Sequence, residues 1–301
     1  MTGHHGSVVG PLLLVPALLF WVYLAAALRE RDRGGWSHWR TASFGAGAAL
    51  LAVAVVVPGH DLVGHMWRHL LIGMLAPLGL VLGAPGTLAL RSVNRPRGRA
   101  LVRLLRHPVV GVLAHPVTGL LLTAGGLYLL HLTPLYRATL ASPALHTLVL
   151  AHFLASGYLF TWAIAGPDPG PHRPGVPVRL VVLGLSVAAH ATLAQLMYAG
   201  LVDAAAPVAH VRAAATLMYY VGDLAEILLA LALLVTWRPT PAPRAPSPAP
   251  RAPRARARAP RARARPARSF TERVAIGGRV ATHSVKLRGS WSGGGARGGV
   301  G

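Results

Sequence analysis

Long apolar runs alternate with short polar stretches along the first 237 residues of the chain. The apolar residues fill these runs continuously, instead of recurring with the period of an amphipathic helix or a half-buried strand. Each run has about the 20 residues that a helix needs to cross the hydrocarbon of a bilayer. The pattern therefore predicts an all-α fold, a polytopic membrane bundle of about seven transmembrane helices. The predicted spans are Val9–Leu28, Thr41–Val57, Asp61–Gly83, Pro116–Leu132, Leu145–Ala165, Val178–Leu201 and Ala213–Thr236.

Small residues within the spans indicate that the helices pack closely, since small side chains let neighbouring backbones approach. Gly45–Ala48 supplies them in the second span, and Gly73 and Ala76 supply them in the third. Pro77 also lies in the third span, where we expect an ordinary bend of the helix.

The composition supports a membrane protein and narrows its chemistry. Of the 301 residues, 53% are hydrophobic and 13% are charged, and the mean hydropathy is +0.49. A soluble domain carries roughly a quarter charged residues. The chain has no cysteine, which excludes disulfides, thiolate metal sites and cysteine-based catalysis.

Residues 238–301 differ in composition from the rest of the chain. They are rich in Pro, Ala and Arg, and they hold 15 of the 30 Lys and Arg residues behind the net charge of +22. Such a low-complexity segment cannot bury a core, so we predict a disordered cytoplasmic tail after a transmembrane domain of residues 1–237. The tail could contact anionic lipid through charge alone or stay solvated, and we expect no specific nucleic-acid partner.

Arginine-rich loops alternate with arginine-poor loops. The rich segments follow the first, third, fifth and seventh spans, and the poor loops contain only Arg137 and Arg212. Because loops rich in Lys and Arg stay on the cytoplasmic side, the alternation predicts an N-terminus outside and a C-terminus inside a multi-pass plasma-membrane protein. The first span has no basic segment before it, so we interpret it as a retained helix rather than a signal peptide.

Most of the ionisable groups inside the spans fall in the outer half of the membrane under this orientation. The candidate metal ligands are the histidines of this layer, which are His65, His69, His131, His146, His152 and His190. His65 and His69 are four residues apart on one helix face, and Asp61 extends that face by one turn. Histidine, methionine and carboxylate without cysteine suit copper, with zinc as the alternative. Each histidine could instead be a hydrogen-bonded packing residue.

Buried charges on two spans call for partners. An arginine inside a span must form an ion pair, reach the interface or line water. Arg68 lies about 12 Å into the membrane, since a helix rises 1.5 Å per residue. We predict a buried ion pair between Arg68 and either Asp223 or Glu226 of the seventh span.

Four motifs occur in an order that resembles a known family. They are HMWRHLLIGMLAPLGLVLGAPGTLALR, which begins at His65, HPVTGLLLTAGGLYLLHLTPLY at 115–136, HTLVLAHFLASGYLFTWAIAGPDP at 146–169, and YYVGDLAEILLALALLVTW, which contains Asp223. Together, over residues 60–238, they resemble the CtaG family of assembly factors for caa-type cytochrome c oxidase.

The resemblance implies a seven-helix protein of the bacterial cytoplasmic membrane that helps to assemble the oxidase. It also implies oxidase subunits as partners and copper insertion as the suspected task. The family's motif positions fall on His65, His69, His115, His131, His146, His152, His190 and Asp223. The chain departs from the family pattern at Arg68, which replaces an uncharged polar residue, and at His210, which replaces an acid.

Three functions are compatible with these residues. The first is an assembly factor that holds or passes copper at the outer face of the membrane. The second is a membrane cytochrome with axial haem ligands from two helices, such as His152 and His190. The third is a proton or metal transporter that uses Arg68, Asp223 and Glu226. An enzyme is not expected, because the sequence contains no GxSxG, HExxH or phosphate-loop motif.

Overall fold

The computed structural model describes residues 5–58, 61–170, 173–202 and 206–237. These residues form twelve α-helices and one π-helical segment and contain no strand, which confirms the predicted all-α fold. The elements are α1 His5–Gly34, α2 His38–Val56, α3 Leu62–Leu70, η1 Leu71–Leu75, α4 Ala76–Leu82, α5 Pro85–Ser92, α6 Arg95–Leu105, α7 Pro108–Leu113, α8 Pro116–Leu132, α9 Leu135–Ala141, α10 Pro143–Ala165, α11 Val176–Tyr198 and α12 Val208–Thr236. The predicted tail, residues 238–301, lies outside the described residues.

Each predicted span overlaps one helix, except the third, which overlaps the consecutive segments α3, η1 and α4. In the described part of the chain, six segments are long and apolar enough to cross a bilayer: Leu13–Arg33, His38–Val56, Leu62–Leu82, Pro143–Ala165, Val176–Tyr198 and Val208–Thr236. A seventh candidate is α8 taken together with α9, which follows it at an angle of 77°. The chain is therefore a polytopic membrane protein of six or seven spans, and its orientation in the membrane stays a prediction.

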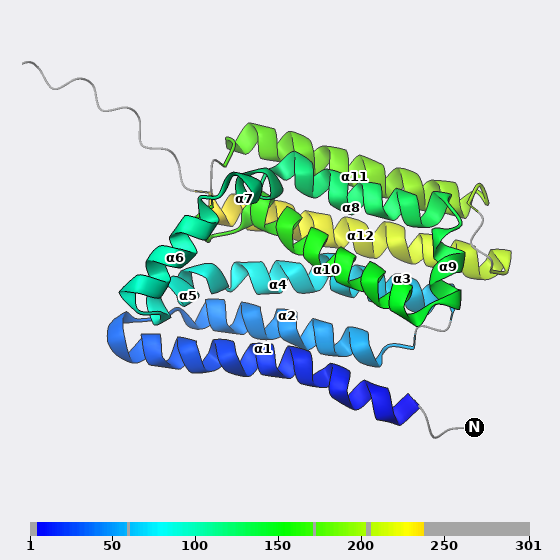
Figure 1. Ribbon diagram of the computed structural model, residues 1–301. Coiled ribbons are helices and arrows are strands. Elements are labelled where there is room, and N and C mark those ends of the chain that lie inside the picture. The colour runs from blue at the N-terminus through cyan, green and yellow to red at the C-terminus, as the bar shows by residue number, and fades with distance from the viewer. Residues whose placement is uncertain (1–4, 59–60, 171–172, 203–205, 238–301) are drawn as a thin grey trace, which may run out of the picture. The chain divides into compact units, whose positions relative to one another are not determined.

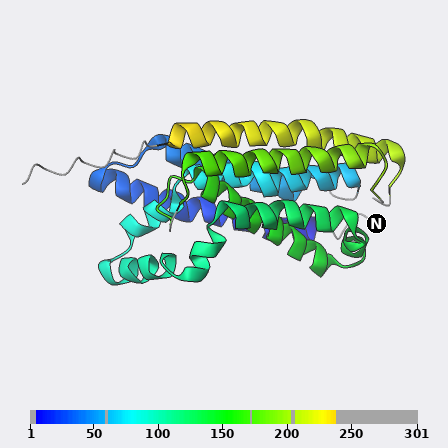
Figure 2. The same cartoon turned by 90° about the horizontal axis from the view of Figure 1, so that it is seen from above.

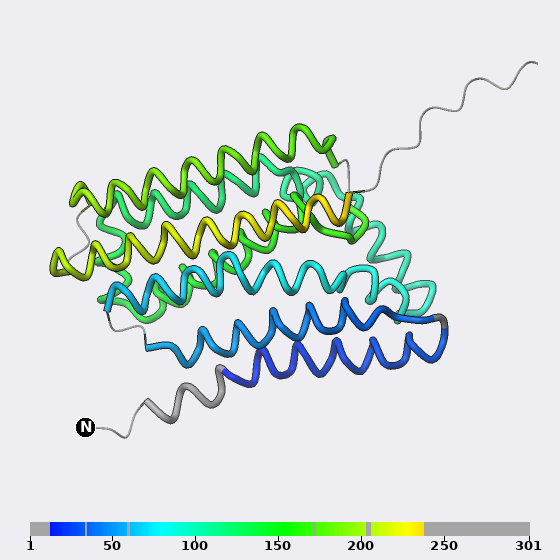
Figure 3. Tube along the Cα trace, turned by 180° about the vertical axis from the view of Figure 1, so that it is seen from behind, coloured from blue at the N-terminus to red at the C-terminus, as the bar shows by residue number. Residues whose placement is uncertain are grey.

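The long helices run side by side in alternating directions (Figure 1). α1 and α2 form one edge of the bundle, α4 packs beside α2, and α8 and α11 lie at the opposite edge, with α10 and α12 between (Figures 1 and 3). The short helices α5, α6 and α7 lie at one end and α9 lies at the other (Figures 1 and 2). The described connections that follow α1 and α10 lie at the same end of the bundle as α5–α7 (Figure 1).

Glycines let α2 and α4 pack closely. A Cβ atom on Gly47 would lie 2.6 Å from the backbone nitrogen of Leu80, and one on Gly79 would lie 2.6 Å from the backbone nitrogen of Gly47. Ser43 adds a hydrogen bond, since its hydroxyl donates to the Gly79 carbonyl at 3.0 Å. The small residues of the second span therefore lie at a helix contact, as predicted.

A π-helical segment interrupts the third span. Pro77 has no N–H to donate to the carbonyl of Gly73, four residues earlier. Gly157 of α10 packs directly against that carbonyl, because a Cβ atom on Gly157 would lie only 1.9 Å from its oxygen. We expected an ordinary bend at Pro77, which stays a prediction, and the structure has η1 ending two residues before it. Single π turns inside α-helices occur frequently at functional sites.

At the α5–α7 end, Asp168 joins the loop after α10 to α5. Its buried carboxylate accepts hydrogen bonds from the Gly86 N–H at 2.8 Å, the Thr87 N–H at 2.6 Å and the Thr87 hydroxyl at 2.6 Å. These N–H groups belong to the first turn of α5, where the helix offers them no acceptor and where an anion is stabilised. Asp168 thus fixes α5 to the connection between α10 and α11.

Candidate functional site

Asp61 and Gly64 set the start of the helix that carries the first two histidines. Asp61 is the N-cap of α3, and its side chain accepts a hydrogen bond from the Gly64 N–H at 2.9 Å. Gly64 lies so close to Pro58 that a Cβ atom there would be 1.9 Å from the Pro58 carbonyl oxygen. His65 and His69 follow on the buried face of α3. Asp61 itself is exposed, and its side chain caps the helix rather than joining the histidines.

Three further elements bring rings around His65. The centroid of its ring lies 5.9 Å from that of His146 on α10, 6.5 Å from that of His131 on α8 and 5.1 Å from that of Tyr136 on α9. His131 also stacks on Tyr136, with centroids 6.2 Å apart. His65 and His131 are buried, and His146 is half-buried. We refer to His65, His131 and His146 as the outer histidine group.

Buried ring nitrogens of this group have no hydrogen-bond partner. Both Nε2 of His65 and Nε2 of His131 are buried and unpartnered. The other nitrogen of His131, Nδ1, lies 3.0 Å from the Leu127 carbonyl oxygen. Because a carbonyl only accepts, Nδ1 carries the proton of the neutral ring and Nε2 keeps a lone pair. Metal-bound histidines donate their second N–H in this way, so His131 has the tautomer of a ligand.

The ring separations allow two histidines to share one ion. With metal–nitrogen bonds of about 2.0 Å, the centroids of two imidazoles on one ion are at most about 6.4 Å apart. The 5.9 Å between His65 and His146 lies within this limit, whereas the 6.5 Å between His65 and His131 slightly exceeds it, so those two rings would have to move closer to share an ion. In the rotamers of the structure, no group of three or more His, Asp or Glu side chains in the described segments is arranged to hold a metal ion. A three-ligand site therefore requires the rings to rotate.

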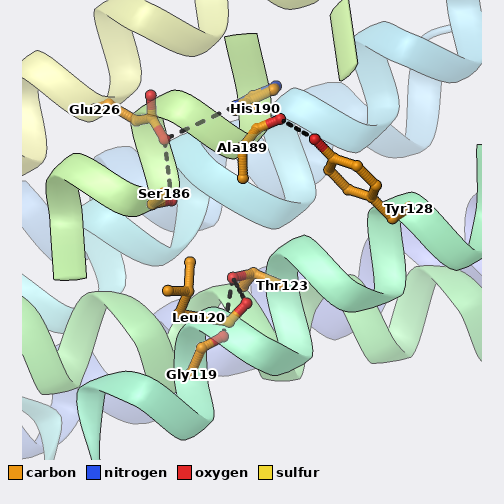
Figure 4. Close-up of polar contacts among 8 residues, drawn as sticks. All are labelled: Gly119, Leu120, Thr123, Tyr128, Ser186, Ala189, His190 and Glu226. Carbon is orange, nitrogen blue, oxygen red and sulfur yellow. Dashed lines mark hydrogen bonds and ion pairs between the residues drawn. The ribbon is translucent and has the colours of Figure 1, made fainter. Parts of the chain in front are cut away.

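A second pair of histidines consists of His69, one turn further along α3, and His190 of α11, beside a cavity of about 60 Å³. The ring centroids of His69 and His190 are 6.3 Å apart. His190 Nδ1 lies 4.0 Å from Glu226 Oε1, and the Ser186 hydroxyl donates to the same oxygen at 3.0 Å (Figure 4). Nδ1 of His69, Nε2 of His190 and Oε2 of Glu226 are buried without a partner. We refer to His69, His190 and Glu226 as the inner group.

The cavity beside the inner group has polar walls on one side. Thr123 and Tyr128 of α8 line it together with hydroxyl groups of α10. Tyr128 donates to the Ala189 carbonyl at 2.9 Å and Thr123 donates to the Gly119 carbonyl at 2.9 Å, so both hydroxyl groups are held in place (Figure 4). The volume is enough for a few water molecules, which could satisfy the unpartnered atoms of the inner group.

His152 has a structural partner instead. Its Nε2 lies 3.1 Å from the Leu122 carbonyl oxygen of α8. The ring also occupies the space beside Gly126, where a Cβ atom would be 2.4 Å from Nε2. His152 therefore links α10 to α8, and the structure brings it into neither histidine group. His115 also has a local role, because it is the N-cap of α8.

The predicted ion pair of Arg68 is wrong. Arg68 Nε donates to the Val57 carbonyl at 2.9 Å, which ties α3 to the end of α2. Glu226 lies beside His190 and accepts a hydrogen bond from Ser186, and Asp223 is half-buried on α12 without an ion pair to Arg68. The physical reason is local, since the last carbonyls of a helix have no partner in the helix and the end of α2 offers one beside Arg68.

Two contributors to the site could not be found by searching the spans for ionisable groups. Tyr136 lies on the short connecting helix α9, and Ser186 is a single hydroxyl in the apolar run of α11. The motif H-L-x-P-L-Y ends at Tyr136 and was the available signal for it. Nothing in the local sequence marks Ser186.

Comparison with known families covers most of this bundle. Residues 21–240 match the family described as cytochrome c oxidase caa3 assembly factor. The chain belongs to this family. The match begins earlier than the four motifs and includes the whole second span. As a member of the caa3 assembly factor family with six or seven apolar spans, the chain is a multi-pass protein of the bacterial plasma membrane.

Curated relatives match a smaller part of the chain. Uncharacterized protein Mb0105 of Mycobacterium bovis and Uncharacterized protein MT0111 of Mycobacterium tuberculosis are each 37% identical to it over 134 residues, which is 42% of this chain and 20% of each relative. Uncharacterized protein ML1998 of Mycobacterium leprae is 34% identical over the same shares. The chain thus spans about a fifth of the length of these relatives. No solved structure matches the chain.

Proposed function

We propose that this caa3 assembly factor binds copper at the outer histidine group and passes it to a subunit of the oxidase during assembly. Copper is the cargo in this proposal and not a resident cofactor. The observation that carries the proposal is the pair of buried, unpartnered Nε2 atoms of His65 and His131, with His131 Nδ1 held by the Leu127 carbonyl. Family membership supports the oxidase as the client.

Unsatisfied polar atoms are the main reason to prefer a ligand over plain packing. Buried polar atoms in proteins nearly always have a partner, and in a membrane an unsatisfied group costs several kcal/mol. Four histidines in the two groups leave a buried nitrogen without one: His65, His69, His131 and His190. A half-buried packing histidine in the same bundle, His152, has its Nε2 paired with a backbone carbonyl. The contrast favours an ion or ordered water at the unpartnered atoms.

The chemistry of the surroundings favours copper among metals. Cuprous copper prefers soft or borderline ligands, including imidazole and thioether. Met66, Met197 and Met218 are fully buried, and they pack in one core cluster with Tyr136, next to the outer histidine group. Two-coordinate binding with opposed ligands fits ring centroids about 6.4 Å apart, close to the observed separations. Zinc, which prefers four ligands, would need larger rearrangement.

The inner group provides copper with a second binding position, one helical turn further into the bundle. His69 follows His65 by one turn of α3, and Glu226 supplies a carboxylate beside His190 that can balance the charge of a bound cation. An isolated cation inside the membrane is costly unless a counter-charge is close. The inner group therefore supports the transfer of copper rather than its permanent storage.

The haem alternative is less well supported. His152, one of the two axial ligands considered for it, uses Nε2 on the Leu122 carbonyl. The cavity beside His69 and His190 is about 60 Å³, whereas pockets for larger organic ligands have about 300–1,000 Å³. The transporter alternative also uses Glu226. It further relies on Arg68 beside the acids of α12, whereas Arg68 donates to the Val57 carbonyl.

Copper titration of the purified full-length protein tests the proposal. We expect the wild-type protein to take Cu(I) from a competing chelator under reducing conditions. His65→Ala and His131→Ala should each lower the affinity at least tenfold, because each removes a ligand. His152→Ala is the matched control and should bind copper like the wild type, since His152 lies outside both groups. Wild-type binding in all three variants, or no binding by the wild type, would contradict a copper site at the outer histidine group.

A further inference from the structure

α6 and α7 form a collar at the end of the bundle opposite the outer histidine group (Figures 1 and 2). A groove of about 930 Å³ lies between α6, α7, the start of α8 and the loop after α10. Its polar walls come from Arg106, His107, His115 and Thr118, and the other lining residues are apolar side chains, proline and glycine. No residue of α6 is buried in the core, so the collar has its surface available to a ligand.

The polar side chains of this groove are chiefly hydrogen-bond donors. His107 and His115 each begin the same sequence, His-Pro-Val, and each Nδ1 accepts a hydrogen bond at 3.3 Å from the valine N–H two residues later. Because Nδ1 accepts, the proton of the ring lies on Nε2, which remains free to donate. Arg106 also has donors and no acceptor. A ligand that fits these walls must present acceptors, and an anion does so best.

Positive charge surrounds the groove without opposing acids. Residues 85–118 contain no Asp or Glu and six arginines, which are Arg91, Arg95, Arg97, Arg99, Arg103 and Arg106. A second hollow of about 580 Å³, lined by Arg95 and Arg99, adjoins the groove and shares Leu90 and Val102 with it. The carboxylate of Asp168, in the loop beside the groove, is engaged by the first turn of α5. The charge of the collar is therefore available to a ligand.

The collar also exposes apolar side chains. Leu104 of α6 is 60% exposed, and Val109 and Val112 of α7 are 56% and 62% exposed. Exposed apolar side chains at the end of a transmembrane bundle pack against lipid acyl chains at the boundary between headgroups and hydrocarbon. A free phosphate, a nucleic acid or an acidic protein would satisfy the arginines and leave these apolar side chains uncovered. The complementary ligand has an anionic headgroup and an apolar tail.

We propose that the groove between α6, α7 and α8 binds the headgroup of an anionic phospholipid, whose acyl chains lie against the exposed leucine and valine side chains of the collar. Arg106 and the Nε2–H groups of His107 and His115 hold the phosphate, and Arg95 and Arg99 hold a second phosphate when the lipid has one. The bound lipid fastens the collar to the membrane surface. This site is separate from the copper site, because the two lie at opposite ends of the bundle.

Lipid retention by the full-length protein tests this site. The protein is reconstituted with phosphatidylcholine, phosphatidylglycerol and cardiolipin in equal amounts, and the lipids that stay bound are counted by native mass spectrometry. We expect the wild type to retain phosphatidylglycerol or cardiolipin in preference to phosphatidylcholine. Arg99→Gln/Arg106→Gln should bind anionic lipid about 25-fold more weakly, since each arginine at a membrane surface contributes roughly a factor of five.

The matched control is Arg29→Gln/Arg31→Gln, which removes the same charge from exposed positions at the same end of the bundle. This control variant should retain anionic lipid like the wild type. Its basic residues after Trp237 are the same as in the wild type. Equal loss in both variants would assign the lipid binding to general surface charge and overturn the groove. Equal retention of phosphatidylcholine by the wild type would overturn it as well. Both variants change only exposed side chains, and their thermal unfolding in phosphatidylcholine should match the wild type.

Discussion

The hydrogen bonds of each histidine decide what it can do in this bundle. His115 and His152 each use a ring nitrogen on a backbone group and thereby fix a helix end or a helix pair. His131 uses Nδ1 on the Leu127 carbonyl and leaves Nε2 buried and unpartnered beside His65. A residue that is oriented but unsatisfied is prepared for a ligand, and this distinction separates candidate copper ligands from packing residues.

Asp168 gives a test of stability at the residue scale. Asp168→Ala should lower the free energy of unfolding by on the order of 3 kcal/mol, because it removes charge-assisted hydrogen bonds to Gly86 and Thr87 and leaves their N–H groups unsatisfied. Thermal unfolding in detergent, followed by circular dichroism, measures the change. Asp32→Ala, at an exposed position on α1, should change stability by less than about 0.5 kcal/mol. Equal stability of the two variants would show that Asp168 does not hold α5.

Sequence reasoning identified the ionisable residues of the spans but not all of their partners. A histidine or acid in an apolar run is visible by its type, because lipid tolerates few such groups. Which neighbour it meets depends on the rotation and pairing of helices, which hydropathy does not report. Arg68 therefore donates a hydrogen bond to the Val57 carbonyl and does not pair with an acid on α12. His190 lies directly beside Glu226, and Ser186, a residue that no pattern marks, donates to the same carboxylate oxygen.

Whole helices were easier to predict than single contacts. The spans follow from hydropathy because a backbone in lipid must satisfy its own hydrogen bonds, which leaves only helices for apolar runs of this kind. The short helices α5, α6, α7 and α9 carry too few apolar residues in a row to give this signal. The segment η1 depends on the placement of Pro77, Gly73 and Gly157 close to one another. These residues belong to the third span and to α10, which are far apart in sequence.

The contact between η1 and α10 gives a test at the scale of elements. Gly157→Ala should lower stability by about 1–3 kcal/mol or more, because the added Cβ atom would lie 1.9 Å from the Gly73 carbonyl oxygen, a backbone atom. Since η1 follows His69 in the chain and contributes Gly73 and Met74 to the wall of the cavity, the variant should also weaken copper binding if the inner group takes part. Unfolding temperature and copper affinity are measured on the same preparation.

Two other helical glycines serve as controls for this substitution. A Cβ atom on Gly125 or Gly184 would meet nothing within 4 Å. Gly125→Ala and Gly184→Ala should therefore be neutral or slightly stabilising, by up to about 1 kcal/mol, because alanine favours a helix over glycine. If Gly157→Ala behaves like these two variants, the close contact of α10 with η1 is not a constraint on the fold.

Viewed as a whole molecule, the bundle separates two kinds of chemistry. The outer histidine group lies toward the α9 end, with the inner group one turn of α3 further into the bundle. The opposite end carries the arginine-rich collar and the junction of Asp168 with α5. A protein that takes a cation from one side of a membrane, while anchored to lipid at the other, would have this arrangement. The family to which the chain belongs is described as cytochrome c oxidase caa3 assembly factor.

The copper content of the oxidase tests the central claim most directly. The caa3-type oxidase is purified from cells that contain the wild-type assembly factor, the His65→Ala/His131→Ala variant or the His152→Ala control, each present in the membrane at the same level. We predict that the ratio of copper to haem in the oxidase falls with His65→Ala/His131→Ala and stays at the wild-type value with His152→Ala. An unchanged ratio with His65→Ala/His131→Ala would contradict the claim that the outer histidine group supplies copper to the oxidase.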